Sequence, residues 1–366
     1  MCRIFSYIIC SVCLVLLFCF VCSATEVSAK GAYALELESG DCVYEKNADI
    51  KMGMASTTKI MTGILVIENL PLNKEVKISS ESVGIEGSSI YLKEGETLTV
   101  ENLLYALLLE SANDAAVALS IATCGSVDSF VDMMNDKAQA LGLKNTHFTN
   151  PHGLDNEEHY TTARDLALLA KYAMSNPIFS EVVSTYKEVI PLGNDGSRVL
   201  INHNKLLRTY SGAVGIKTGF TKKCGRCLVS CAEVEGVKII AVTLNAPNDW
   251  EDHKIMLDLG LSQYENITLA NVGDYSISLD TINGVKSSVL CSNLDSLSVT
   301  LKRDNINITA SLESNRMVSA PIKQGDLVGK IIFKNNGVEI ASLDLYAIES
   351  VKGIKYKKSI FERIFR

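Results

Sequence analysis

The hydrophobic positions of residues 30–262 switch between the two-residue spacing of strands and the spacing of helices. Residues 32–37 and 42–44 alternate around a Ser-Gly-Asp turn, which predicts a hairpin. A helix is predicted to begin at Ser56. Further helices are predicted at 99–123, 126–141 and 248–261, and further strands at 76–79, 90–92, 188–191, 198–201, 215–218, 227–233 and 237–245. Strands on both sides of a helical middle predict an α+β domain with one antiparallel sheet.

The most apolar segment, residues 99–123, has a polar interruption at its centre. A helix that is apolar on all sides is typical of a protein core. Polar groups in such a place lower stability unless they have hydrogen-bond partners. The interruption at residues 110–114, with the sequence Glu-Ser-Ala-Asn-Asp, is therefore expected to have a specific purpose. A Thr-Ala-Arg-Asp sequence at 162–165 predicts a capped helix start.

The composition changes near residue 263. Short apolar alternations broken by Asn-Gly turns predict a small all-β domain, a β-sandwich, at 263–350. Residues 351–366 are basic and place apolar side chains at helical spacing. Such a segment predicts an anchor on the outer face of the cytoplasmic membrane. A terminal helix packed on the body and a disordered end are the alternatives.

The N-terminus resembles a secretory signal peptide. Arg3 precedes an apolar run at residues 8–21. Two small-residue cleavage sites follow, which end at Ala24 and at Ala29. The run is shorter than the ~20 residues that span a bilayer, so a retained anchor is the less favoured alternative. Residues 1–29 are therefore predicted to contain a signal peptide that is cleaved after Ala24 or Ala29. The mature chain, beginning with the domain at 30–262, is expected outside the cytoplasm, secreted or peripheral on the membrane.

Charge and cysteine content narrow the possible ligands. The formal net charge of −7 argues against a nucleic-acid partner. Disulfides are possible in an exported chain, but buried thiols are the preferred interpretation. The Cys224, Cys227 and Cys231 cluster lacks a fourth zinc ligand at suitable spacing, and the five histidines are interpreted as structural. No metal and no cofactor are expected. The cysteines beyond the leader are Cys42, Cys124, Cys224, Cys227, Cys231 and Cys291.

Ser56 and Lys59 form the first candidate for chemistry. Residues three apart on a helix are neighbours, with Cβ atoms roughly 5–6 Å apart. A lysine at that distance can accept the serine proton if it is neutral, and burial and nearby positive charge favour the neutral form. A helix start also favours negative charge that develops on the serine. A Ser-x-x-Lys sequence on its own is more often a cap followed by a surface lysine.

Two further motifs change that judgement. Ser111-Ala112-Asn113 and Lys217-Thr218-Gly219 follow in the order that is typical of penicillin-binding proteins and class A β-lactamases. The chain resembles the low-molecular-mass D-alanyl-D-alanine carboxypeptidases, the penicillin-binding protein 5-like serine peptidases, over residues 30 to about 350. The stretches that carry this resemblance are residues 55–62, 108–116, 148–155, 159–167, 204–207 and 215–221.

The resemblance implies a penicillin-binding/β-lactamase-like fold and an activity. The enzyme would remove the terminal D-Ala from peptidoglycan stem pentapeptides through an acyl-enzyme on Ser56, and β-lactams would inhibit it. Lys59 would be the general base, and Ser111 would relay the proton to the leaving nitrogen. Asn113 would hold the substrate amide and Lys59.

The resemblance also implies how the Lys-Thr-Gly strand binds substrate. The peptide would add to the strand at Lys217, Thr218 and Gly219, and Lys217 and Thr218 would meet the terminal carboxylate. The backbone N–H groups of Ser56 and Phe220 would form an oxyanion hole. Many relatives have a carboxylate-binding arginine where Asp249 falls, so either another cation does that work here or carboxylate binding is weaker.

Two other functions are compatible with the motifs. A class A β-lactamase needs a deacylating glutamate between the second and third motifs, and Glu157 and Glu158 do not stand in the expected context. A non-catalytic protein that binds β-lactams or cell wall is the other alternative. The intact nucleophile and base positions argue against it.

Overall fold

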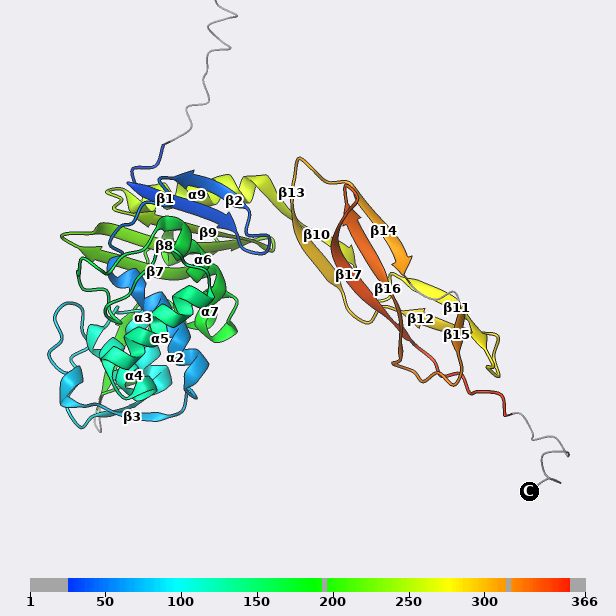
Figure 1. The fold of residues 1–366 in the computed structure, drawn as a ribbon, viewed down its shortest axis with the longest axis horizontal. Coiled ribbons are helices and arrows are strands. Elements are labelled where there is room, and N and C mark those ends of the chain that lie inside the picture. The colour runs from blue at the N-terminus through cyan, green and yellow to red at the C-terminus, as the bar shows by residue number, and fades with distance from the viewer. Residues whose placement is uncertain (1–25, 193–195, 314–316, 356–366) are drawn as a thin grey trace, which may run out of the picture. The chain divides into compact units, whose positions relative to one another are not determined.

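A computed structural model describes residues 26–192, 196–313 and 317–355 (Figure 1). The chain forms two compact units, of which the first holds residues up to Gly260 apart from Glu235–Val237. The second holds Glu235–Val237 and the chain from Leu261 onwards. Most of the predicted leader and of the predicted basic tail lies outside the described residues.

A five-stranded sheet forms the framework of the first unit, with strand order β2-β1-β9-β8-β7 (Figure 1). The predicted hairpin is confirmed: Ala32 pairs with Lys46, and Leu35 pairs with Cys42. The strand β7 lies at the edge of the sheet. The bounds are β1 Gly31–Glu36, β2 Cys42–Lys46, β7 Ala213–Thr221, β8 Gly225–Val234 and β9 Val237–Leu244.

Helices cover both faces of this sheet (Figure 1). Ile240 and Val242 of β9 belong to the main core beneath the sheet, whereas Ile239 points to Gly260 of α9 on the other face. The helix α2 runs through the centre of the main core and is buried from Lys59 to Val66. The bounds are α2 Lys59–Asn69, α3 Val100–Leu108, α4 Asn113–Cys124, α5 Val127–Ala140, α6 Ala163–Met174, α7 Pro177–Ser184, α8 Leu206–Thr209 and α9 Asp249–Gln263.

The polar interruption of the apolar segment is confirmed as the break between α3 and α4. Asp114 is buried there, and its carboxylate accepts hydrogen bonds from Ser89 Oγ and from the backbone N–H groups of Ile90 and Leu92. The predicted strand at 90–92 is therefore wrong, because a side chain takes up its backbone donors. The strand that pairs with β3 Glu75–Lys77 is β4 Thr97–Thr99.

Local capping signals explain the helix starts. Ser126 Oγ accepts from the backbone N–H of Ser129 before α5, and Thr162 Oγ1 accepts from that of Asp165 before α6. The sequence interpretation missed α7, although Asn176 as the cap and Pro177 as the first residue are typical of a helix start. It also missed the short α8. The other predicted strands form a hairpin of β5 Lys187–Pro191 and β6 Ser197–Ile201.

The second unit consists of strands from Tyr264 onwards, which confirms the predicted all-β domain. A six-stranded sheet has the order β14-β16-β17-β12-β11-β15, and β10 and β13 form a separate pair. One core surrounds Phe333 and Leu345, and another surrounds Val289 and Cys291. The bounds are β10 Tyr264–Ala270, β11 Ser276–Ile282, β12 Ser288–Ser292, β13 Leu297–Lys302, β14 Ile308–Glu313, β15 Met317–Ser319, β16 Leu327–Asn335 and β17 Val338–Ala347.

The cysteines are less uniformly buried than expected. Cys227, Cys231 and Cys291 are buried thiols, as predicted. Cys42 is exposed, because it begins the edge strand β2, and Cys124 and Cys224 are partly buried. The described residues contain no disulfide and no group of three residues suited to a metal ion.

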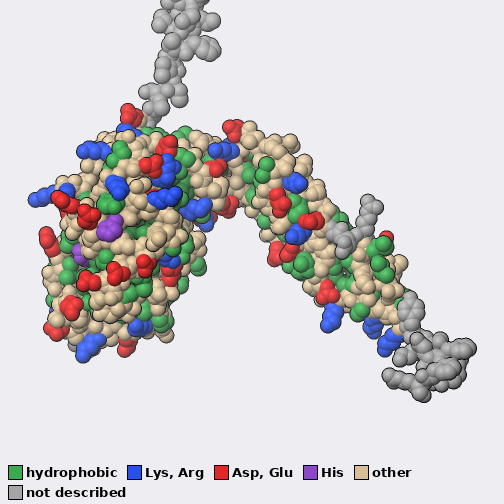
Figure 2. All heavy atoms as spheres, in the orientation of Figure 1, with side chains coloured by type: hydrophobic (Ala, Val, Ile, Leu, Met, Phe, Trp, Pro, Cys, Tyr) green, Lys and Arg blue, Asp and Glu red, His purple; other side chains and the backbone are tan. Residues whose placement is uncertain are grey.

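Two further features of the described residues are the distribution of surface charge and the length of the apolar helices. Figure 2 shows acidic and basic side chains interspersed on one face of the first unit. In the described ranges no single helix is long and apolar enough to cross a membrane; α4 and α5 reach that length together, with a bend of 84° between them.

Candidate active site

Ser56 lies in a tight turn that leads into the central helix. A 3₁₀ helix at Ala55–Thr58 continues directly into α2, so the predicted helix start at Ser56 is confirmed with a tighter first turn. Thr57 Oγ1 donates to Met54 O, and Thr58 Oγ1 donates to Ala55 O. These bonds fasten the turn on both sides of the serine.

Lys59 lies in the core with its amine at the serine. Its side chain is fully buried, and Nζ lies 3.2 Å from Ser56 Oγ. Nζ also donates to Asn113 Oδ1 at 2.7 Å and to His152 O at 2.6 Å. The Lys59 amine thus joins three segments that are far apart in the sequence: the Ser56 turn, the segment at Asn113 and the loop at His152.

Burial shifts the protonation of two lysines in this region. The pKa of Lys59 is well below 10.5, first because burial disfavours the charged amine and second because Lys217 is nearby. Asp114 acts in the opposite direction. Burial also lowers the pKa of Lys217 to about 7, against an opposing effect of Glu110. The Lys217 amine donates to Thr218 O at 3.1 Å.

Ser111 and Asn113 occupy the break between α3 and α4. Ser111 is buried, has a φ of 62°, and its Oγ has no hydrogen-bond partner among the described residues. Asn113 Nδ2 donates to Glu86 O at 2.5 Å. A Cβ added to Gly87 would lie 2.7 Å from that nitrogen, so only glycine allows the loop to approach Asn113 this closely.

The strand β7 passes beside Ser56. A Cβ added to Gly219 would lie 3.0 Å from Ser56 N and 3.1 Å from Thr57 N. Thr218 pairs with Leu228 of β8, and the exposed Phe220 pairs with Arg226. The strand predicted at residues 215–218 is confirmed and is longer than expected, because β7 extends to Thr221.

A cavity of about 340 Å³ opens at this site. It is lined by the predicted residues Ser56, Ser111, Thr218, Gly219 and Phe220, while Lys59, Asn113 and Lys217 are buried. The remaining lining residues come from four other parts of the chain, and of these the sequence interpretation had placed only Asp249 at the site. They are Ser88, His203, Lys205, Arg226, Asp249 and Trp250.

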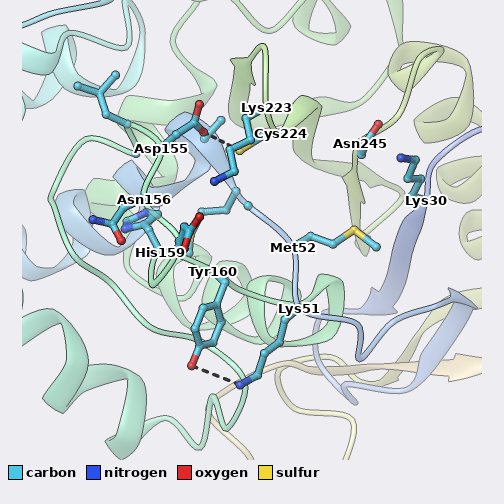
Figure 3. Close-up of a pocket in the computed structure, with 16 residues that line it drawn as sticks. Lys30, Lys51, Met52, Asp155, Asn156, His159, Tyr160, Lys223, Cys224 and Asn245 are labelled. Carbon is cyan, nitrogen blue, oxygen red and sulfur yellow. Dashed lines mark hydrogen bonds between the residues drawn. The ribbon is translucent and has the colours of Figure 1, made fainter.

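A second cavity, of about 510 Å³, touches the segment before the serine (Figure 3). None of the predicted site residues lines it. Lys51 donates to Tyr160 Oη there, and the Cys224 thiol donates to Asp155 Oδ1 (Figure 3). Glu157 lines this cavity rather than the one that holds Ser56.

His159 contacts the turn that holds Ser56. Its Nδ1 accepts from the backbone N–H of Thr149, so Nε2 carries the proton and donates to Thr58 Oγ1 at 2.7 Å. Burial lowers the pKa of His159 to about 4, which keeps the ring neutral. The interpretation of His159 as structural agrees with these contacts. His203 instead lies in the wall of the site cavity, beside Glu110.

A serine beside a buried lysine, opposite a Lys-Thr-Gly strand, places the protein in the class of penicillin-binding serine enzymes. A family model described as D-alanyl-D-alanine carboxypeptidase matches residues 19–248. A second model, for the C-terminal domain of penicillin-binding protein 5, matches residues 264–353. The chain belongs to the D-alanyl-D-alanine carboxypeptidase family.

Individual relatives match over most of their length. D-alanyl-D-alanine carboxypeptidase DacF of Bacillus subtilis is 33% identical, over 88% of this chain and 86% of its own. DacC of Escherichia coli is also 33% identical, over 90% of this chain and 86% of its own. The crystal structure of DacD from Francisella tularensis has a TM-score of 0.64 at 29% identity and covers 90% of this chain and 95% of its own.

Proposed function

We propose that this protein is a serine-type D-alanyl-D-alanine carboxypeptidase that removes the terminal D-Ala from peptidoglycan stem pentapeptides. Ser56 is the nucleophile, and β-lactams acylate it in the same way. The observation that carries this proposal is the environment of the Lys59 amine.

The hydrogen-bond count at Lys59 favours a base. A neutral amine has two N–H groups and one lone pair. Asn113 Oδ1 and His152 O can only accept, so they take both hydrogens. The lone pair is then left for the Ser56 hydroxyl at 3.2 Å. Burial keeps the amine in this neutral form, so it can accept the serine proton.

Acylation follows from this arrangement. Ser56 Oγ forms a bond to the carbonyl carbon of the penultimate D-Ala, and its proton passes to Lys59. The backbone N–H groups of Ser56 and Phe220 bind the resulting oxyanion, and such a donor typically contributes ~10²–10³ in rate. The C–N bond then breaks, and the leaving amine needs a proton. Ser111 Oγ, which has no other partner among the described residues, relays that proton from Lys59.

Deacylation reverses the roles with water. Lys59 takes a proton from water, water attacks the ester carbonyl, and Ser56 leaves with that proton. A β-lactam acylates Ser56 through the same steps when its amide bond opens. Its leaving group stays attached, so water enters less easily and release is slow.

The edge position of β7 supports binding of the peptide as an added strand. A strand at a sheet edge has unpaired backbone groups that an extended peptide can use. Gly219 keeps this edge close to the Ser56 amide. Lys217 and Thr218 contribute to the binding of the terminal carboxylate, and Asn113 to that of the substrate amide.

We also propose the domain limits and location that the sequence predicts. The peptidase domain comprises residues 30–262 and the β-sandwich residues 263–350, after removal of a leader within residues 1–29. Basic residues in 351–366 hold the enzyme peripherally on the outer face of the cytoplasmic membrane. These limits fit the two compact units, which divide near Leu261.

The test measures D-Ala release from a muropeptide pentapeptide and covalent labelling by fluorescent penicillin. Wild type should release D-Ala and carry the label on Ser56, Ser56→Ala should do neither, and the control Ser184→Ala should match wild type. Labelling without D-Ala release would indicate a binding protein. Rapid hydrolysis of penicillin would indicate a β-lactamase. Undiminished activity of Ser56→Ala would contradict the assignment of the nucleophile.

A further inference from the structure

Arg226 places a positive charge in the wall of the site cavity, and no step of the proposed reaction uses it. It lies on β8 directly opposite Phe220 of β7, so both side chains are on the same face of the sheet as Thr218. Arg226, Phe220 and Thr218 all line the cavity that contains Ser56. The motifs of the sequence do not include this arginine.

A buried acid fixes the orientation of the Arg226 guanidinium. Arg226 Nε donates to Asp249 Oδ1 at 2.9 Å, and Nη2 lies 2.9 Å from Asp249 Oδ2. The Asp249 side chain is 3% exposed, whereas that of Arg226 is 41% exposed. The backbone N–H of Trp250 also donates to Asp249 Oδ1, and the Trp250 ring centre lies 5.6 Å from Arg226 Cζ. This two-point contact holds the planar group in one orientation.

The guanidinium keeps donors for a ligand. A guanidinium has five N–H groups, and the contact with Asp249 uses one on Nε and one on Nη2. Both hydrogens of Nη1 and one of Nη2 remain. Because the exposed part of Arg226 lines the cavity, these donors are available to an anion there.

The anionic end of the proposed substrate needs a cation in the cavity. This need rests on the proposed function, in which the peptide ends in D-Ala and its leaving residue carries a carboxylate. Lys217 is buried and donates to Thr218 O, which limits its contact with that group. Lys205 lines the cavity with an exposed side chain, and its Nζ lies 5.9 Å from the centre of the Trp250 ring, which is itself only partly buried. Arg226 alone of these three is both oriented by a buried partner and open to the cavity.

We propose that Arg226, held by Asp249, binds the terminal carboxylate of the substrate and makes the enzyme specific for a free C-terminus. The guanidinium comes from β8, while the acid that orients it comes from the start of α9. Asp249 is therefore a positioning residue, and Arg226 is the residue that contacts substrate.

The experiment compares two acyl-D-alanine thioesters with the full mature chain. One has a thioglycolate leaving group, which carries a carboxylate, and the other has a neutral ethanethiol leaving group. The measured quantity is the ratio of kcat/KM for the charged substrate to kcat/KM for the neutral one. Loss of a charge-assisted hydrogen bond predicts that Arg226→Gln lowers this ratio about tenfold to a hundredfold. Arg226→Lys should lie between Arg226→Gln and wild type.

Three further variants make the test specific. Arg303→Gln removes another acid-paired arginine, in the second unit, and should leave the ratio unchanged. The exchange Arg226→Asp with Asp249→Arg keeps the pair and moves the guanidinium to α9, so it should recover part of the lost ratio. An unchanged ratio in Arg226→Gln, or a larger loss in Lys205→Met, would overturn the proposal. If wild type hydrolyses neither thioester, the proposed function itself fails.

Discussion

The close approach of Gly219 to Ser56, the proposed nucleophile, gives the sharpest prediction. Replacing Gly219 with alanine adds one methyl group opposite the amides of Ser56 and Thr57. That Cβ would lie 3.0 and 3.1 Å from these nitrogens, whereas ordinary contact begins at 3.4 Å. Both neighbours are backbone atoms, so β7 and the serine turn must separate by a few tenths of an ångström.

The size of the effect follows from what this separation disturbs. The Ser56 N–H is a proposed oxyanion donor, and complete loss of one such donor costs ~10²–10³ in rate. A displaced donor retains part of its effect, so Gly219→Ala should slow acylation about tenfold to a hundredfold. Overpacking should cost roughly 1–3 kcal/mol of stability, which a domain of this size tolerates.

The assay is the second-order rate of Ser56 acylation by fluorescent penicillin, with thermal unfolding as a check on the fold. Gly63→Ala is the matched control, because its Cβ would meet only side-chain atoms of Leu108 and Phe179 at 3.4 Å. That variant should react at the wild-type rate. A folded Gly219→Ala protein that also reacts at the wild-type rate would refute the argument.

Two further predictions follow from buried groups. Between the folded pKa of Lys217, about 7, and its ordinary value of 10.5, the unfolded chain holds a proton that the folded chain lacks, so this lysine makes stability rise with pH. Lys217→Met should therefore be more stable than wild type in urea at pH 7 and gain less stability towards pH 9; equal slopes would contradict this. Leader removal should occur after Ala24, because Val27 is buried and Asp252 accepts from the N–H groups of Ser28 and Ala29. Intact-mass analysis should find Thr25 as the first residue, and a chain that begins at Lys30 would be the contrary result.

The sequence predicted most features that depend on neighbouring residues. The hairpin of β1 and β2, the break between α3 and α4 and the cap of α6 all follow from local spacing and turn chemistry. The three motifs could also be identified from the sequence, because each lies within one short stretch of the chain. At residues 90–92 local reasoning failed because a distant side chain intervenes: Asp114 takes the backbone donors of residues 90 and 92.

Only the tertiary structure decided which distant residues meet at the candidate site and how deeply they are buried. The partners of the Lys59 amine stand 54 and 93 residues further along the chain, and the full burial that lowers its pKa is a property of the packed core. The pairing of Arg226 with Asp249 likewise joins β8 to the start of α9. A sequence specifies residue types and local geometry, whereas desolvation and contact between distant residues exist only once the core has packed.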